Sequence, residues 1–237
     1  MASITLSTPV GELVAGHPEL FRVFEELKID YCCHGERRLE DACQQRKLDP
    51  NQVLQILNRS EGPPPDTRNW AVAPLTELCD HIEQTHHEYL RKELPHLDQL
   101  TTTVEETHGR RHPELQEVKS VFQDLQAELV PHMMKEEQIL FPAIRQLEAA
   151  SEPLTLPFGT VKNPIRMMEH EHDVVGETLG RLHTLTGGYQ IPRDACNTYC
   201  AMLQGLHELQ LDLHQHIHKE NNILFPRARA QEAALGC

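Results

Sequence analysis

The chain has 237 residues, of which 22 are basic and 36 acidic, giving a formal net charge of -14 at pH 7. This charge would repel a phosphate backbone, which excludes nucleic acid as an expected partner. Single domains cluster near about 100 to 150 residues, so the length predicts two structural units. Aromatic residues make up only 5% and runs of β-branched residues are absent, which predicts an all-α protein.

Targeting and membrane signals are absent from the sequence. No basic segment followed by an apolar run opens the chain, and no stretch approaches the ~18 uninterrupted apolar residues of a membrane span. We therefore expect a cytoplasmic protein that does not bind a membrane. The seven cysteines have no dense, regular spacing, so they are expected to be free thiols. The sixteen histidines are an excess that suggests a metal site.

Residues 1–60 are predicted to form a small domain of short helices. Apolar residues recur at helical spacing from Pro18 onward, and Asp49 followed by Pro50 is typical of a capped helix start. Cys32 and Cys33 are adjacent between these two helices. The proline-rich run over 61–73 cannot continue a helix and indicates a linker. Residues 74–237 then form a second domain.

Four long segments of helical periodicity lie in this second domain, which predicts a four-helix bundle. In the second and fourth segments apolar residues alternate in steps of four and three, as on the core-facing seam of a bundle helix. Each seam residue of the fourth segment lies 84 residues after its counterpart, so an internal repeat relates the two. The segments cover residues 74–105, 113–148, 163–187 and 192–226. The two seams are Val118, Phe122, Leu125, Leu129, His132, Glu136 and Ile139, and Met202, Leu206, Leu209, Leu213, His216, Glu220 and Ile223.

Each of these seams carries a polar pair on an otherwise apolar face, His132 with Glu136 and His216 with Glu220. Residues four apart lie on one helix face about 5–6 Å apart, so the members of each pair converge. Burying an ionised glutamate without a partner is costly. Two divalent cations bridged by the two carboxylates would neutralise that charge, while imidazoles complete the coordination. The sequence therefore predicts a dinuclear metal site inside the bundle.

The other two helices are expected to supply one further histidine each. His172 lies on the apolar seam of the third segment, whereas His170 does not. In the first segment the periodicity is ambiguous, because the apolar residues before position 83 are in phase with His86 and those after position 89 with His87. Spacing alone does not choose between these two histidines.

Three motifs of the bundle, together with the adjacent Cys32 and Cys33, carry a family resemblance. They are His132-Met-Met-Lys-Glu-Glu-Gln-Ile-Leu-Phe-Pro, Glu171-His-Asp and Glu220-Asn-Asn-Ile-Leu-Phe-Pro-Arg-Ala. With them the chain resembles the RIC family of di-iron proteins for repair of iron centres, also called the YtfE/ScdA/DnrN/NorA group. The likeness covers almost the whole chain. It implies an ScdA-type N-terminal domain over 1–60 and a hemerythrin-like four-helix bundle over 74–237.

The resemblance implies a non-haem di-iron centre in which both glutamates bridge the irons beside an oxo or hydroxo group. It selects His87 over His86, because the matching histidine lies six residues after His81 and seven before Leu94-Pro. Zinc, which prefers four ligands often including cysteine, fits this donor set less well than iron, and manganese is the second choice. The implied ligands are His87, His132, Glu136, His172, His216 and Glu220.

By resemblance, the expected function is the repair of iron–sulfur clusters damaged by nitrosative or oxidative stress, with iron donated to damaged iron–sulfur proteins. Cys32 and Cys33 are the candidate catalytic thiols, because adjacent cysteines close a strained, easily reduced ring and could pass iron on. The alternative is a protein that binds, scavenges or reduces nitric oxide at the same centre. The sequence leaves open whether the chain is an enzyme and whether it forms a homodimer.

The remaining histidines and cysteines have less specific interpretations. His108 and His112 are expected in a solvated loop at the first turn of the bundle. Cys196 and Cys200 share a helix face and are interpreted as two small core residues rather than a metal site. The histidines that flank the ligands, expected at the surface or in a supporting role, are His170, His214 and His218.

Overall fold

The computed structural model describes residues 4–60 and 68–236 of the chain. Regular structure in these residues is helical, apart from two isolated bridges that join Pro9 to Arg38 and Leu156 to Gly159. The expected all-α class is therefore confirmed. None of the described helices is long and apolar enough to cross a membrane. The elements are α1 (Val10–Gly16), η1 (Pro18–Leu20), α2 (Phe21–Glu26), α3 (Leu39–Gln45), α4 (Pro50–Arg59), α5 (Leu75–Ile82), η2 (Glu83–His87), α6 (Glu88–His108), α7 (Glu114–Lys135), η3 (Glu136–Leu140), α8 (Phe141–Ala149), α9 (Lys162–Leu185), α10 (Asn197–Lys219), η4 (Glu220–Leu224) and α11 (Phe225–Ala234).

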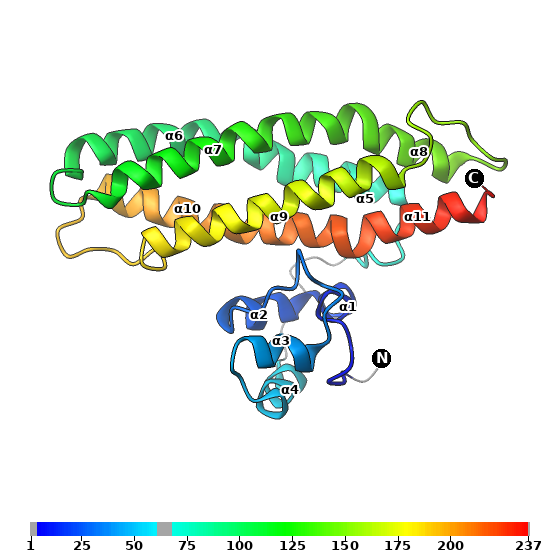
Figure 1. The fold of residues 1–237 in the computed structure, drawn as a ribbon, viewed down its shortest axis with the longest axis horizontal. Helices are drawn as coiled ribbons and strands as arrows, with labels where there is room; N and C mark the ends of the chain where they lie inside the picture. Colours follow the sequence, from blue (N-terminus) through cyan, green and yellow to red (C-terminus); the bar gives the residue numbers. More distant parts are fainter. Residues whose placement is uncertain (1–3, 61–67, 237) are drawn as a thin grey trace. The chain divides into compact units, whose positions relative to one another are not determined.

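The chain divides into two compact units, and the first contains residues 1–79, 144–160 and 214–237 as far as they are described. Its N-terminal part, blue in Figure 1, consists of the short helices α1 to α4 around buried side chains such as Phe24 and Leu57. Helix α4 begins as the sequence predicts. The Asp49 carboxylate accepts a hydrogen bond from the Asn51 backbone N–H at 2.9 Å, and Pro50 occupies the first turn.

The expected linker over 61–73 lies partly outside the described residues, because the structure describes only 68–73 of it. At its end, the Arg227 guanidinium donates to the carbonyl oxygens of Trp70 at 2.9 Å and Ala73 at 2.6 Å. The Glu148 carboxylate accepts hydrogen bonds from two backbone N–H groups at the start of α5, at 2.5 and 2.8 Å. A carboxylate at a helix N-terminus stabilises that end, so Glu148 fixes where the first long helical segment begins.

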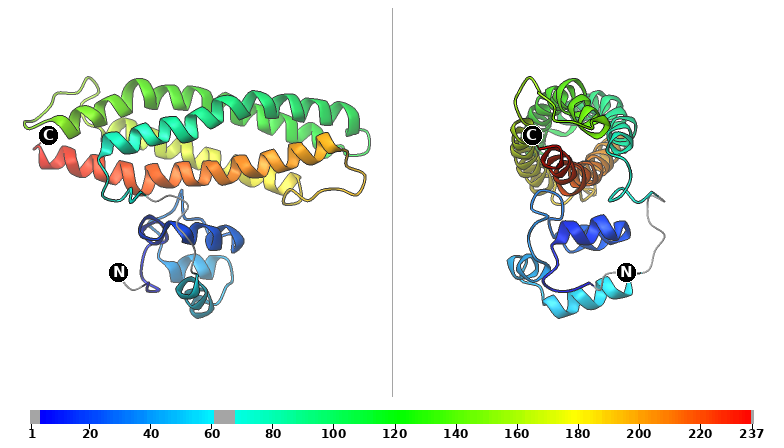
Figure 2. Two further views of the ribbon diagram at one scale, coloured as in Figure 1. Left: turned by 180° about the vertical axis from the view of Figure 1, so that it is seen from behind. Right: turned by 90° about the vertical axis from the view of Figure 1, so that its right-hand side faces the viewer.

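The second compact unit contains residues 80–143 and 161–213. In it α7 packs against both α6 and α9, and Figures 1 and 2 show the long helices running lengthwise beside one another. The predicted seams face inward: Leu90, Phe122, Leu179 and Leu206 are each at most 1% exposed. Helix α10 begins at Asn197, later than expected, because a hydrogen bond of 3.1 Å from the Ala195 N–H to the Pro192 carbonyl closes a turn first.

Three of the long helical segments contain a π-helical turn, namely η2, η3 and η4. A π-turn inserts one residue and so rotates the following helix face by about 100°. The turns η3 and η4 lie 84 residues apart, at equivalent positions of the repeat. Pro142 and Pro226 follow them by two residues, and each crowds the carbonyl four residues earlier, which lies inside the π-turn. The wider turn relieves this crowding.

The π-turns explain where the expected helical phase succeeds and where it fails. Because η2 separates the residues in phase with His86 from those in phase with His87, both histidines are buried. The core position expected for Ile139 is wrong: its side chain is 46% exposed, and Leu140 is buried instead. A strict four-and-three spacing assumes an unbroken α-helix, so it slips by one residue at each π-turn.

Candidate metal centre

The six residues that the sequence singles out as ligands all have buried side chains, none of them more than 3% exposed. Each is placed by a long helical segment. His132 and Glu136 come from the α7–η3 segment, and His216 and Glu220 from the α10–η4 segment. His87 is the last residue of η2, and His172 lies in the middle of α9. The candidate ligands therefore cluster at the π-turns in three of the four segments, and π-turns are frequent at functional sites.

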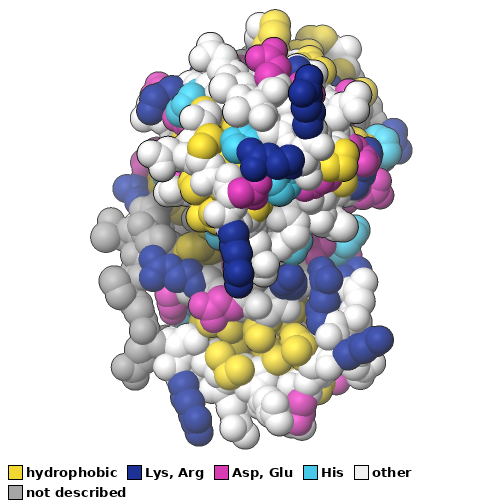
Figure 3. Space-filling view, turned by 90° about the vertical axis from the view of Figure 1, so that its left-hand side faces the viewer, with side chains coloured by type: hydrophobic (Ala, Val, Ile, Leu, Met, Phe, Trp, Pro, Cys, Tyr) yellow, Lys and Arg dark blue, Asp and Glu magenta, His cyan; other side chains and the backbone are white. Residues whose placement is uncertain are grey.

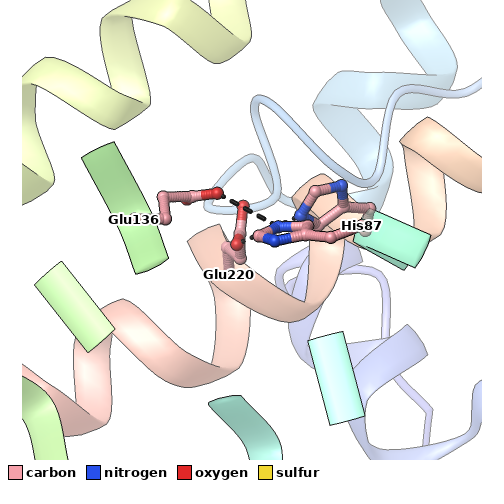
Figure 4. A group of neighbouring side chains, drawn as sticks. His87, Glu136 and Glu220 are labelled. Carbon is pink, nitrogen blue, oxygen red and sulfur yellow. Dashed lines mark hydrogen bonds and ion pairs between the residues drawn. The ribbon is translucent and has the colours of Figure 1, made fainter. Parts of the chain in front are cut away.

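These six residues form two overlapping groups, each able to hold a metal ion. One contains His87, Glu136, His216 and Glu220, and the other His132, Glu136, His172 and Glu220. In each group the potential ligand atoms lie within 4.8 Å of one another. Figure 4 shows His87, Glu136 and Glu220 pointing toward one another. Because both glutamates belong to both groups, two ions would each receive two imidazoles and share two carboxylates.

The Nε2 atoms of the histidines point into the centre. The His87 and His132 Nε2 atoms lie 3.3 and 3.4 Å from Glu136 Oε2, and His216 Nε2 lies 3.2 Å from Glu220 Oε1. The His132 and His172 Nε2 atoms are 3.2 Å apart. Metal-binding histidines use one ring nitrogen for the ion and the other for an outer hydrogen bond. The His87 and His132 rings fit that pattern.

Two carboxylates outside the centre determine which nitrogen of these rings carries the proton. His87 Nδ1 donates to Glu137 Oε1 at 2.6 Å, and His132 Nδ1 donates to Glu171 Oε2 at 2.8 Å. With the proton on Nδ1, the Nε2 lone pair of each ring faces the Glu136 carboxylate. Two electron-rich atoms face each other favourably only with a cation between them. The donor set therefore fits a bound metal.

Glu171 is held in the charged form that this role requires. The hydrogen bond from His132, together with the ion pair to Lys135, lowers the pKa of Glu171 to about 2 against the opposing effect of burial. Glu137 accepts from Arg91 as well as from His87. Sequence reasoning missed both carboxylates, because glutamate is common on exposed helix faces and neither lies on an apolar seam.

His86 is buried beside His87 but belongs to neither group. Its Nδ1 lies 2.8 Å from Asp212 Oδ1, an interaction between the first and the fourth helical segments. Burial alone would not have separated the two histidines, since both are less than 4% exposed. The two rings, which lie at successive positions of η2, are separated by the direction in which each points. Of the two histidines that spacing left open, His87 belongs to a group that could hold a metal ion and His86 does not.

Cys32 and Cys33 form a third group with Asp30 whose atoms could hold a metal ion. The two sulfur atoms are 3.7 Å apart, and the Asp30 carboxylate accepts from both backbone N–H groups at 3.1 and 3.0 Å. The neighbouring Cys33 thiol and burial raise the pKa of Cys32 well above its ordinary value. Cys32 is therefore a neutral thiol at pH 7 rather than a ready nucleophile.

The loop that carries Cys32 is fixed to η4 by side-chain amides. Asn222 Nδ2 donates to the carbonyl oxygens of Tyr31 at 3.2 Å and Cys32 at 3.0 Å, and Asn221 Nδ2 donates to Cys32 O at 3.3 Å. A Cβ atom at Gly35 would lie 2.0 Å from Asn222 Oδ1, so a larger residue there would displace the Asn222 amide. The thiol-bearing loop is thus attached two residues beyond Glu220.

Two of the histidines that flank the ligands also contact the N-terminal residues. His214 Nδ1 donates to Glu25 Oε1 at 2.7 Å, and His218 Nδ1 lies 3.3 Å from the Tyr31 carbonyl oxygen. His170, by contrast, is exposed. A surface position for His170 and a supporting role for the other two agree with the expectation from helical phase.

Comparison with known families gives the class of protein to which this fold and this group of side chains belong. Residues 80–228 match the hemerythrin HHE cation binding domain, and residues 6–61 match a domain of unknown function, DUF542, named ScdA_N. The chain therefore belongs to the hemerythrin HHE family of cation-binding helical bundles, with a small ScdA_N domain before the bundle.

Relatives of nearly the same length narrow this class. A protein of Musicola paradisiaca (strain Ech703) named iron-sulfur cluster repair protein YtfE is 37% identical over 228 residues, which cover 94% of this chain and 97% of the relative. The proteins of that name in Enterobacter sp. (strain 638) and Escherichia coli O81 (strain ED1a) are each 38% identical over 224 residues, with the same coverage. The resemblance inferred from the sequence is thereby confirmed.

Proposed function

We propose that this protein repairs iron–sulfur clusters damaged by nitrosative or oxidative stress by donating iron from a di-iron centre. The observation that carries the proposal is the pair of buried groups that share Glu136 and Glu220. The name of the relatives, iron-sulfur cluster repair protein, supports the same activity. On this proposal the partners are damaged iron–sulfur proteins, and the six buried residues are the ligands.

The donor set favours iron over other metals. Structural zinc sites hold one ion in four ligands that usually include cysteine, whereas the six buried residues are four histidines and two carboxylates. Carboxylate-bridged pairs in helical bundles bind iron or manganese. Imidazole is a better ligand for iron than for manganese, which prefers oxygen. A bridged iron pair would supply ferrous ions that can leave the centre one at a time.

The protein side chains would control how the iron is held and released. Glu137 and Glu171 keep His87 and His132 in the tautomer whose Nε2 lone pair faces the centre. A shared carboxylate can bind one ion or two, so Glu136 and Glu220 could keep one ion after the other has left. Release would then not leave an unpaired charge in the core.

Cys32 and Cys33 are proposed as the site that binds the iron after its release from the centre. Their loop is attached to the turn that begins with Glu220, and together with Asp30 they offer three ligand atoms. Cys32 is a neutral thiol, and a thiol must lose its proton before it binds a metal ion. The cost of that deprotonation would weaken the binding of iron, which suits a transient ligand. This favours a role as metal ligands over a role as nucleophiles.

An iron-tracing experiment tests the proposal. Protein loaded with ⁵⁷Fe is incubated anaerobically, with a thiol reductant, with an enzyme whose cluster has been damaged by nitric oxide. We expect the enzyme to regain activity and its cluster to contain the label. Glu136→Ala and Glu220→Ala should revive nothing, while His170→Ala, a change at an exposed histidine beside His172, should act like the wild type.

Two results would count against this function. Equal revival by the glutamate variants would show that the centre is not the source of iron. An unlabelled revived cluster, together with an iron-nitrosyl that stays on this protein, would instead favour the alternative function of binding nitric oxide.

A further inference from the structure

Cys196 is a thiol outside the metal centre, next to the start of α10. Its side chain is exposed and Cys200, one turn later, is half-buried, so the interpretation of both as core residues is wrong for Cys196. His108 is the last residue of α6 and only 4% exposed, so its expected place in a solvated loop is also wrong. The turn before α10 brings the thiol back against the end of α6. Figure 3 is drawn from this end of the helices and shows histidines among basic and acidic side chains.

The Cys196 sulfur occupies the capping position of α10. The backbone N–H groups of Thr198 and Tyr199 donate to it, and His108 Nε2 lies 3.2 Å from it. Free N–H groups at a helix N-terminus, with the positive end of the helix dipole, stabilise an anion. A thiolate is the anion that cysteine can provide there.

His108 is oriented as a donor to this sulfur. The ring is buried and packs against Tyr199, with ring centres 5.3 Å apart. Among the described residues, no group forms a hydrogen bond with His108 Nδ1. Burying an N–H without an acceptor costs more than burying a lone pair, so the proton of the neutral ring lies on Nε2 and points at Cys196.

The charged groups around Cys196 and His108 do not cancel the stabilisation of the Cys196 thiolate. On the side of α7, His112 bonds to Glu114 and Asp194, both at 3.1 Å, and Arg111 pairs with Asp194 at 3.2 Å. The Asp194 charge is thus neutralised by its own partners. The backbone N–H of Tyr199 and then the His108 ring lower the pKa of Cys196 to about 7.

A metal site does not account for this arrangement. In the described part of the chain, the groups of side chains able to hold a metal ion include neither His108 nor Cys196. His108 lies 21 residues after His87, which corresponds to roughly 30 Å along the helix. A cysteine at a helix N-terminus that also accepts a hydrogen bond from an imidazole N–H is instead a usual arrangement of an activated thiol.

We propose that Cys196 is a modification site whose thiolate captures low-molecular-weight disulfides by thiol–disulfide exchange. The Cys196 sulfur attacks one sulfur of the disulfide, and a new S–S bond forms as the old one breaks. The displaced sulfur leaves with the electron pair and takes a proton from water, so Cys196 is oxidised as one equivalent of thiol is released. Exchange is fastest for an attacking thiol whose pKa is near the ambient pH. Excess thiol reverses the reaction.

Labelling of the full-length, metal-loaded protein with oxidised glutathione tests this proposal. Mass spectrometry of the peptides should find the adduct on Cys196 first, with a rate that rises between about pH 6 and 8. The direction of this pH dependence follows from the lowered pKa of Cys196. The thiolate is lost as the pH falls below about 7, and the labelling rate falls with it. At pH 7 the lowered pKa should make Cys196 roughly 5-fold faster than an unperturbed exposed thiol.

Two variants sharpen the test. His108→Gln should move the pH midpoint upward and slow the reaction at pH 7, whereas Cys200→Ser should leave both unchanged. Faster labelling of Cys33 or Cys200 in the wild type, or a midpoint near 9, would overturn the proposal even if His108→Gln does not fold. Cys196→Ser should lose the adduct but keep its iron and its cluster-repair activity, so failure here is distinct from failure of the proposed function.

Discussion

The two halves of the 84-residue repeat share their inward-facing residues but differ on the outside. In both halves a buried histidine, a buried glutamate and a π-turn lie at equivalent positions. In the first half the outer residues Val130, Met134 and Ile139 are 44%, 51% and 46% exposed. Their counterparts in the second half are His214, His218 and Ile223, of which the last two are buried.

The N-terminal segment accounts for this difference. His214 and His218 contact Glu25 and Tyr31, and α1 packs against η4. The inner seam therefore carries the candidate ligands in both halves, while the outer face of the second half alone contacts the segment that contains Cys32. A duplicated helix can keep one chemistry and acquire a second contact, because opposite faces of a helix are independent in sequence.

The largest effect is expected from replacing either of the two shared glutamates, which belong to the inner face that the two halves have in common. Glu136→Ala and Glu220→Ala each remove a donor from both groups, so both variants should lose tightly bound iron. A ligand at 1,000 times its Kd stabilises a folded protein by about 4 kcal/mol. Iron should therefore raise the Tm of the wild type and of Glu128→Ala, an exposed control on α7, but not of either variant. Full iron retention by one of the two would contradict equal sharing.

The second prediction concerns the π-turn of the first half. Leu140→Ala should destabilise the protein by roughly 2–5 kcal/mol, because Leu140 fills the core. Ile139→Ala should change the free energy of unfolding by less than about 0.5 kcal/mol, since the side chain is at the surface. Denaturant unfolding measures both values. The reverse ranking would mean that α7 continues as an unbroken α-helix.

Removing the hydrogen bond between His132 and Glu171 should have a smaller effect, which is confined to metal affinity. Glu171→Gln keeps the shape but removes the charge that holds the Nδ1 proton, so metal affinity should fall by about 10- to 100-fold. Competition with a chelator of known affinity measures the change. Glu169→Gln, which lies two residues earlier on α9, is the control. An unchanged affinity in Glu171→Gln would show that the carboxylate does not support the ligand.

The smallest effect should come from the contact that only the second half makes. Asn222→Ala removes hydrogen bonds to two backbone carbonyls and should cost about 1–3 kcal/mol of stability. Gln138→Ala, at the equivalent exposed position of the first half, should cost less than about 0.5 kcal/mol. The exposure of Cys33 to a thiol reagent should rise in Asn222→Ala alone. Equal effects of the two changes would contradict the asymmetry between the halves.

Much of this arrangement could be predicted from the sequence. Apolar spacing decides which helix face is buried, so the seams and the burial of five of the six candidate ligands follow from it. The register of His87 could not be obtained in this way, because a π-turn shifts the phase between the two ends of one segment. The signal was nevertheless present: a change of phase within a helix, with a histidine in phase on each side.

Other features depend on contacts between distant parts of the chain, which spacing does not encode. Glu171 is distinguished from other glutamates by its contacts with His132 and Lys135, which are 39 and 36 residues away. Cys196 and His108 are 88 residues apart. They meet because the turn that precedes α10 brings Cys196 back to the end of α6. The high pKa of Cys32 arises from the contact with the Cys33 thiol and from burial, and the adjacency of the two cysteines in the sequence does not indicate that burial.

Mössbauer spectroscopy of ⁵⁷Fe-loaded protein, joined to metal analysis, tests the central claim most directly. The shared glutamates predict two iron ions per chain that are magnetically coupled. His87→Ala should disturb this pair, and His86→Ala should leave its coupling intact. A single uncoupled iron in the wild type, or a pair that is lost in His86→Ala and retained in His87→Ala, would contradict the account.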